Sequence, residues 1–125
     1  MKITEIRPPR EFAVGRDAGI TLKDCARVAL EPDEQVTFVT PGGGEYDVAR
    51  KSWGFYATPS TNGRLRDFGI RSALVRNAAG RHNVMLVERA RQVEFDRYAK
   101  DESLTVVCWL DDDAVLARLG EAFAR

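Results

Sequence analysis

Short apolar runs separated by turn residues occupy residues 20–88 of the chain, and after residue 88 the apolar period lengthens from two residues to about 3.6. Residues 26–30 alternate loosely between apolar and polar side chains. Residues 36–40 are rich in β-branched side chains and residues 53–58 in aromatic ones, which is typical of strands. Pro32-Asp33 lies between the first two runs and indicates a turn, because proline presets the backbone angle that a turn requires. This alternation predicts hairpins rather than parallel strands joined by helices.

The clearest predicted hairpin joins residues 70–76 to residues 81–88. The four residues between them end in Gly80, which can adopt the positive φ that such a connection needs. Residues 84–87 are all apolar, which favours a strand covered on both faces.

The helical period predicts helices over residues 89–100 and 111–125. The second carries an apolar stripe, which we expect to close the core over a central strand at residues 104–110. The stripe consists of Val115, Leu116, Leu119, Ala122 and Phe123.

These patterns predict an α+β fold, mainly an antiparallel sheet of six or seven short strands with two C-terminal helices. A β-barrel or sandwich with helical decoration is the alternative. At 125 residues, the chain has the usual length of one domain. We expect an irregular N-terminal arm over residues 1–19, because Pro8-Pro9 offers no backbone donors, then mostly strands over 20–110 and a helix over 111–125.

The chain carries 19 basic and 19 acidic residues, so its net charge is zero. This balance disfavours nucleic acid as a partner, because binding to phosphates needs excess positive charge. The sequence shows no apolar run of the roughly 20 residues that cross a bilayer and no signal peptide, so we expect no membrane association and a cytoplasmic location. Cys25 and Cys108 are expected to be buried, reduced thiols, because the sequence shows no sign of export.

Several motifs suggest chemistry but have a simpler explanation. Gly42-Gly43-Gly44 precedes Lys51-Ser52, yet Arg50 stands where a phosphate loop needs glycine, so a turn is favoured. Asp47 occupies the place of the third glycine of a dinucleotide fingerprint. We therefore expect no nucleotide cofactor from these glycines.

The acidic run Asp111-Asp112-Asp113 could ligate a divalent cation, but a helix N-cap is favoured. His82 is the only histidine, which excludes a histidine-cluster metal site and favours a surface residue over a catalytic base. The sequence thus predicts neither a metal nor a cofactor.

Residues 30–36, Leu-Glu-Pro-Asp-Glu-Gln-Val, resemble the step that precedes the first motif of cupin barrels. Asp33 stands where that motif has glycine, and the metal-binding histidines of cupins have no counterpart. The resemblance is confined to this segment, so no cupin metal site is carried over and no family is assigned.

The segment from residue 50 to residue 71 combines aromatic and arginine side chains and is the predicted ligand site. Arginines bind phosphate or carboxylate bidentately, and aromatic rings stack on planar or sugar faces. An amphipathic strand followed by a solvated charged loop is the alternative interpretation. The candidate ligand-binding residues are Arg50, Lys51, Tyr56, Ser60, Asn62, Arg64, Arg66 and Arg71.

The sequence therefore predicts a small binding or accessory domain that self-associates and holds an anionic small molecule, such as a sugar phosphate or a nucleotide-like compound. One alternative is a small enzyme acting on a phosphorylated or anionic metabolite, with Glu45, Asp47, Tyr56 or His82 moving a proton. The other is a protein-interaction module. The expected partners are a second copy or another protein, and the sequence does not decide whether the protein is an enzyme.

Overall fold

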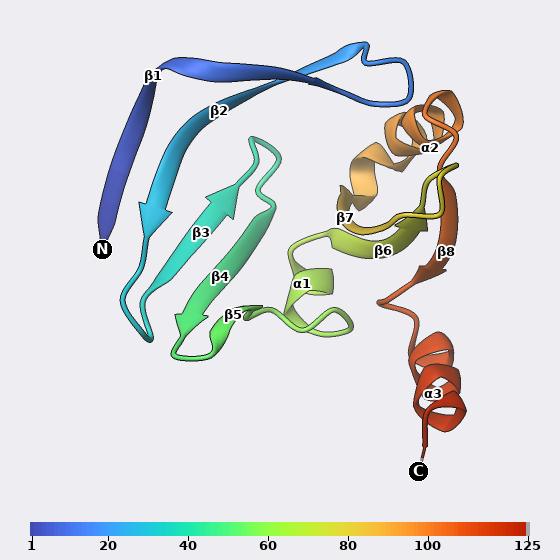
Figure 1. The fold of residues 1–125 in the computed structure, drawn as a ribbon. Coiled ribbons are helices and arrows are strands. Elements are labelled where there is room, and N and C mark those ends of the chain that lie inside the picture. The colour runs from blue at the N-terminus through green and yellow to red at the C-terminus, as the bar shows by residue number, and fades with distance from the viewer. Residues whose placement is uncertain (125) are drawn as a thin grey trace. The chain divides into compact units, whose positions relative to one another are not determined.

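A computed structural model describes residues 1–124 and shows strands along most of the chain, with the two longest helices in its last third (Figure 1). The elements are β1 (Lys2–Val14), β2 (Ile20–Ala29), β3 (Gln35–Val39), β4 (Glu45–Lys51), β5 (Gly54–Ala57), α1 (Arg64–Asp67), β6 (Ile70–Arg76), β7 (His82–Glu88), the 3-10 turn η1 (Arg89–Arg91), α2 (Gln92–Asp101), β8 (Thr105–Trp109) and α3 (Asp113–Ala122).

The strands form three small sheets, with the orders β1-β2, β3-β4-β5 and β7-β6-β8. The strand pairs β1–β2, β4–β5, β6–β7 and β6–β8 are all antiparallel. None of the sheets in residues 1–124 closes into a barrel. The predicted α+β class with antiparallel pairing and two C-terminal helices is confirmed, although the strands divide among three sheets.

The chain divides into two compact units. The N-terminal unit consists of Met1–Val36 and Val48–Ala57, and the C-terminal unit consists of Thr37–Asp47 and the residues from Thr58 onward. The single domain expected from the chain length stays a prediction. No helix within residues 1–124 has both the length and the apolar character to cross a membrane.

The N-terminal unit contains the long β1–β2 hairpin, so the expectation of an irregular arm over residues 1–19 is wrong. The two prolines fall inside β1, where the pairing register shifts between Glu5 and Arg10. A register shift releases residues from the ladder, so prolines that cannot donate a hydrogen bond are tolerated there.

Cys25 is exposed on β2 and Cys108 is partly exposed, so the expected burial of the two free thiols is also wrong.

The core of the C-terminal unit surrounds β6, the middle strand of its sheet. Ala73 and Val75 are almost completely buried. The β6–β7 hairpin is confirmed, and in its turn the Asn77 side chain accepts hydrogen bonds from the backbone N–H groups of Ala79 and Arg81.

Two expectations about neighbouring strands are wrong. β8 lies at a sheet edge rather than in the centre. β7 is also an edge strand, and Val84 is 57% exposed, so it is not covered on both faces. The reason is that β6 takes both neighbours, which leaves each of them one unpaired edge.

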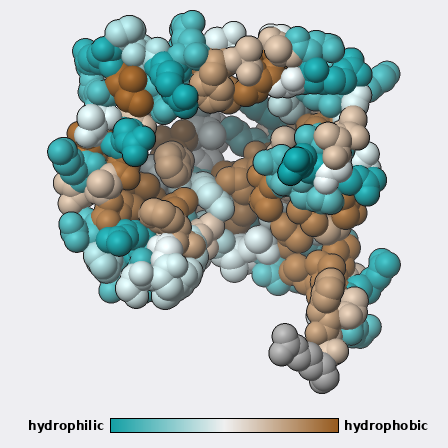
Figure 2. Space-filling model, viewed as in Figure 1, coloured by the Kyte–Doolittle hydropathy of each residue, from teal (hydrophilic) through white to brown (hydrophobic). Residues whose placement is uncertain are grey.

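The last helix begins at Asp113 rather than at residue 111, and the predicted N-cap is confirmed, because the Asp112 side chain accepts hydrogen bonds from the N–H groups of Ala114 and Val115. Its stripe does not close the core, however. None of the α3 side chains is fully buried, and Phe123, which follows the helix, is 79% exposed. Figure 2 shows apolar surface along α3. The indole of Trp109, at the end of β8, packs against α2 instead, with its ring centroid 6.0 Å from that of Phe95. Arg125, at the end of the predicted helix, lies outside the described residues.

Candidate functional site: an apolar cavity in the C-terminal unit

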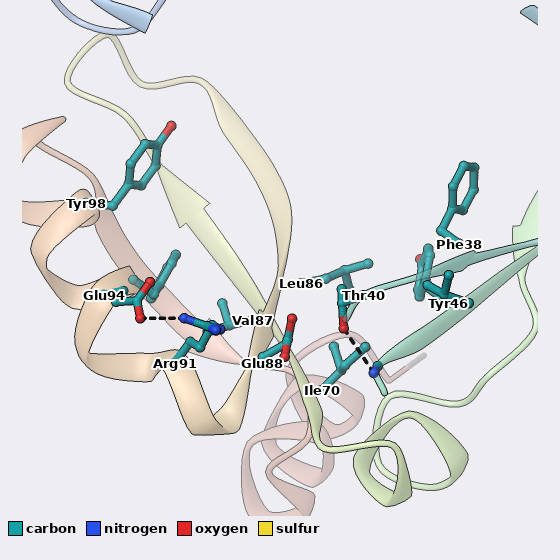
Figure 3. Close-up of a pocket in the computed structure, with 13 residues that line it drawn as sticks. Phe38, Thr40, Tyr46, Ile70, Leu86, Val87, Glu88, Arg91, Glu94 and Tyr98 are labelled. Atoms are coloured by element: carbon teal, nitrogen blue, oxygen red, sulfur yellow. Dashed lines mark hydrogen bonds and ion pairs between the residues drawn. The ribbon is translucent and has the colours of Figure 1, made fainter. Parts of the chain in front are cut away.

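A cavity of about 680 Å³ lies within the C-terminal unit (Figure 3). One wall comes from the β3–β4 hairpin, the base from the start of β6, and the other wall from β7, η1 and α2. This volume falls within the range of roughly 300–1,000 Å³ that is usual for small-molecule sites. The lining residues are Phe38, Val39, Thr40, Gly44, Tyr46, Ile70, Leu86, Val87, Glu88, Arg91, Glu94, Phe95 and Tyr98.

The glycine-rich turn between β3 and β4 lets the hairpin pack closely against β6. The backbone N–H of Thr40 donates to the Gly44 carbonyl over 2.9 Å, and the Gly44 N–H donates to Thr40 Oγ1 over 3.0 Å. A Cβ on Gly44 would lie 2.9 Å from Cδ1 of Ile70, closer than side chains tolerate. Gly43 has a φ of +89°, which favours glycine. The predicted turn is confirmed, and its small residues allow the close approach that shapes one wall.

Glu88 places a carboxylate at the cavity. It ends β7 and is half-buried, and a Cβ on Gly42 would lie 2.7 Å from its Oε2. Within residues 1–124, the Glu88 side chain has no hydrogen-bond or ion-pair partner among protein groups. The other two charged lining residues pair with each other, since Arg91 Nη1 lies 2.8 Å from Glu94 Oε1. The lining side chains therefore carry one negative charge that no lining cation matches.

Aromatic rings come from both walls. In Figure 3, Tyr98 on α2 and Phe38 on β3 stand on opposite sides of the cavity. Both remain partly exposed, so their faces are accessible. Burial raises the pKa of the Tyr46 hydroxyl, which therefore stays protonated near neutral pH and can donate a hydrogen bond. The cavity thus combines apolar and aromatic contact surface with a few polar groups.

The predicted site residues are divided between the two units. Arg50, Lys51 and Tyr56 belong to the N-terminal unit. Arg50 Nη1 donates to the Leu30 carbonyl over 3.0 Å. Lys51 pairs with Asp33, which raises the pKa of the Lys51 amine. The Tyr56 ring lies beside the exposed Trp53 ring, with centroids 6.3 Å apart.

Arg64 and Ser60 lie in the C-terminal unit, but the Arg64 guanidinium is already paired. Its Nη1 lies 2.6 Å from Oδ2 of the buried Asp47, and its Nη2 donates to Thr58. Asp47 also accepts a hydrogen bond from Thr37 over 2.6 Å. These hydrogen bonds, that of Thr37 first and that of Arg64 second, lower the pKa of the Asp47 carboxyl. The backbone carbonyl of Ser60 accepts hydrogen bonds from the backbone N–H groups of Gly63 and Leu65 at the start of α1.

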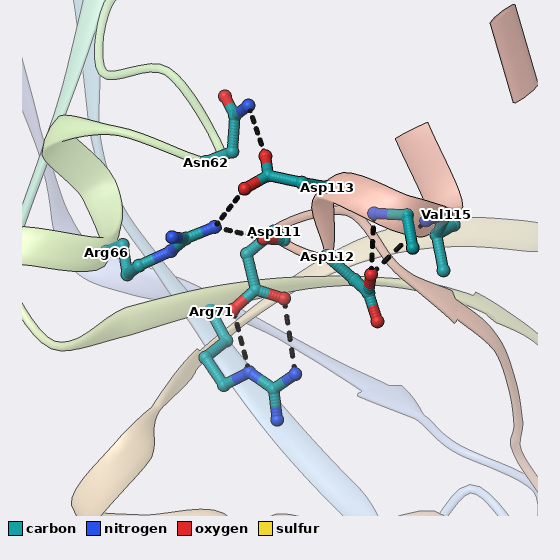
Figure 4. Close-up of polar contacts among 8 residues, drawn as sticks. Asn62, Arg66, Arg71, Asp111, Asp112, Asp113 and Val115 are labelled. Carbon is teal, nitrogen blue, oxygen red and sulfur yellow. Dashed lines mark hydrogen bonds and ion pairs between the residues drawn. The ribbon is translucent and has the colours of Figure 1, made fainter. Parts of the chain in front are cut away.

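Asn62, Arg66 and Arg71 converge on the acidic run before α3 (Figure 4). Asn62 Nδ2 donates to Asp113 Oδ1 over 2.9 Å, and Arg66 pairs with Asp113 and with the backbone carbonyl of Asp111. The acidic run therefore does more than cap α3, because it also gathers side chains of the predicted binding segment.

Arg71 forms the most buried of these pairs. Its Nε and Nη2 lie 2.9 and 3.2 Å from the two oxygens of Asp111, and its Nη1 donates to Gln92. Its guanidinium carbon lies 3.9 Å from the centre of the Trp109 ring. The hydrogen bond from Arg71 lowers the pKa of the Asp111 carboxyl. Arg64, Arg66 and Arg71 therefore all have carboxylate partners, and an anionic ligand would compete with these carboxylates.

The sequence did not point to Glu88, Tyr46 or Tyr98 as site residues. They come from three separate segments of the chain, β7, β4 and α2. His82 is exposed at the start of β7, outside the cavity lining.

Neither a protein-family model, nor a curated protein, nor a solved structure matches this chain. The functional proposals below therefore depend on geometry and chemistry alone.

Proposed function

We propose that this protein is a binding domain that takes up a small, mainly apolar organic ligand in the cavity of its C-terminal unit. The observation that carries the proposal is a cavity of about 680 Å³ lined mostly by apolar and aromatic side chains. Sites of this size and lining are the usual binding places of small organic molecules.

The cavity is a better candidate for the ligand site than the arginine segment, residues 50–71, that the sequence analysis predicted. Arg64, Arg66 and Arg71 form ion pairs with aspartates of the same unit. These ion pairs account for the three arginines without a ligand. The aspartates are Asp47, Asp113 and Asp111. Binding of an anionic metabolite there stays a prediction, as do the enzymatic alternative, a protein partner and a cytoplasmic location.

A rough affinity follows from the apolar surface that a ligand buries. A phenyl-sized ligand that buries about 150 Å² of apolar surface gains about 4 kcal/mol. This gain corresponds to a Kd of about 1 mM. Fragments of this size are therefore suitable probes when they are used at millimolar concentration.

The test titrates 2-phenylethanol into the 15N-labelled full chain and follows backbone amide shifts. We expect saturable shifts at residues on β7, α2 and the β3–β4 hairpin. Leu86→Trp, which fills the cavity from β7, should abolish them. Val84→Trp places the same side chain two residues away on the same strand, outside the lining, and should preserve binding. Absence of saturable shifts in the wild type, or equal binding by both variants, would refute the proposal.

Self-association is the second candidate, and the exposed apolar side chains of β8 and α3 favour it. Val107 is 46% exposed and Phe123 is 79% exposed, and a groove of about 510 Å³ runs between strand and helix. Light scattering coupled to size-exclusion chromatography should show a dimer that Leu119→Glu dissociates. A monomer at high protein concentration would rule this candidate out.

A further inference from the structure

The charged side chains around the cavity indicate what kind of ligand fits it. The lining contains Glu88, Arg91 and Glu94, and the ion pair between the last two leaves the charge of Glu88 unmatched within the lining. We propose that the ligand is a primary amine with an aromatic or aliphatic body, whose ammonium group is bound by the Glu88 carboxylate. This inference rests on the proposed function of the cavity.

The position of Glu88 supports this assignment. The residue ends β7 immediately before η1, and its carboxylate lies against Gly42 of the facing turn. A Cβ at position 42 would lie 2.7 Å from Oε2, so the carboxylate lies directly against the backbone of this turn. In Figure 3 the carboxylate lies between the two walls rather than pointing away from them. An ammonium group at this point could donate charge-assisted hydrogen bonds to it.

The aromatic side chains fit the same ligand. Ring faces attract cations through their quadrupole and also pack against apolar groups. Phe38, Tyr46 and Tyr98 supply such rings from both walls. The ligand body would then contact Leu86 and Ile70, while its ammonium group stays near the single unmatched carboxylate.

An anionic ligand fits less well. The only cationic lining residue, Arg91, is paired with Glu94, and a second negative charge beside Glu88 would be repelled in a partly enclosed site. The cavity therefore differs in charge preference from the arginine segment.

The test compares three probes that share a phenyl ring on a two-carbon chain: 2-phenylethylamine, 2-phenylethanol and 3-phenylpropanoate. Each is titrated into the full chain at pH 7, where the amine is protonated. A hydrogen bond to a charged group strengthens binding enough that the amine should bind roughly tenfold more tightly than the alcohol. The carboxylate should bind most weakly of the three.

Glu88→Gln should bring the amine and the alcohol to within about twofold of each other, mainly by weakening the binding of the amine. Glu121→Gln removes the same charge from α3, outside the lining, and should preserve the preference for the amine. Equal binding of amine and alcohol by the wild type, or tightest binding of the carboxylate, overturns the amine assignment and leaves the cavity proposal standing. If none of the probes binds, the cavity proposal itself fails. The comparison within the wild type holds even if Glu88→Gln does not fold.

Discussion

Removal of the Asp111 charge should be the most destabilising single polar change in the C-terminal unit. Asp111 receives two hydrogen bonds from Arg71, at 2.9 and 3.2 Å, and the exposed fractions of the two side chains are 6% for Asp111 and 23% for Arg71. Asp111→Asn would leave the guanidinium of Arg71 beside Trp109 without its counter-charge.

Breaking a buried ion pair from one side costs about 3–5 kcal/mol. We expect about 3 kcal/mol, the low end, because the guanidinium keeps some solvent contact and its hydrogen bond to Gln92. With a urea dependence of about 1.5 kcal/mol per molar, the unfolding midpoint should fall by about 2 M. Urea titrations followed by circular dichroism and by tryptophan fluorescence would measure this shift.

Two controls separate the ion pair from general effects of charge. Glu94→Gln breaks the exposed pair with Arg91 and should change stability by less than about 1 kcal/mol. The double variant Arg71→Met/Asp111→Asn should be more stable than the sum of the single variants implies, because no unpaired charge remains. A loss below about 1 kcal/mol for Asp111→Asn, or additive effects in the double variant, would refute the reasoning.

Three further predictions concern stability. Thr37 and Arg64 lower the pKa of Asp47 in the folded protein. Its carboxylate therefore stabilises the fold above the unfolded pKa of about 4, and this contribution is lost as the pH falls through the folded pKa. Between pH 5 and pH 2, the urea midpoint of the wild type should fall by more than that of Asp47→Asn. Gly44→Ala should lower the free energy of unfolding, measured in urea, by about 1–3 kcal/mol through overpacking. Gly120→Ala in α3, where a Cβ meets nothing within 4 Å, should raise it by up to about 1 kcal/mol. Equal effects of the two substitutions would contradict this account. Asp112→Ala removes the α3 N-cap and should cost about 1 kcal/mol, and an unchanged thermal midpoint would show that the cap contributes nothing.

Much of the local structure could be predicted because it depends on neighbouring residues. The β6–β7 hairpin follows from two apolar runs on either side of a turn that ends in Gly80. The start of α3 follows from the carboxylate of Asp112, which reaches the free N–H groups of the first helical turn. The order of strands could not be predicted, because the apolar character of β7 and β8 does not reveal that both flank β6.

The candidate site could not be predicted either, because it also depends on contacts between distant segments. Glu88 gives no signal in sequence, since a glutamate at the end of a strand is ordinary. It becomes distinctive only when the turn at Gly42 lies against its carboxylate. The arginines, by contrast, were visible in the sequence, but the carboxylates that pair with them lie 17 to 47 residues away along the chain.

The sequence by itself determined the class of fold, the β6–β7 hairpin and the capped start of α3, because turn chemistry and capping act over a few residues. Tertiary structure decided which strands lie at edges, which apolar side chains remain exposed, and which charges are matched. These properties depend on contacts between distant segments. The unmatched carboxylate of Glu88, in a cavity whose walls come from distant parts of the chain, belongs to this second group.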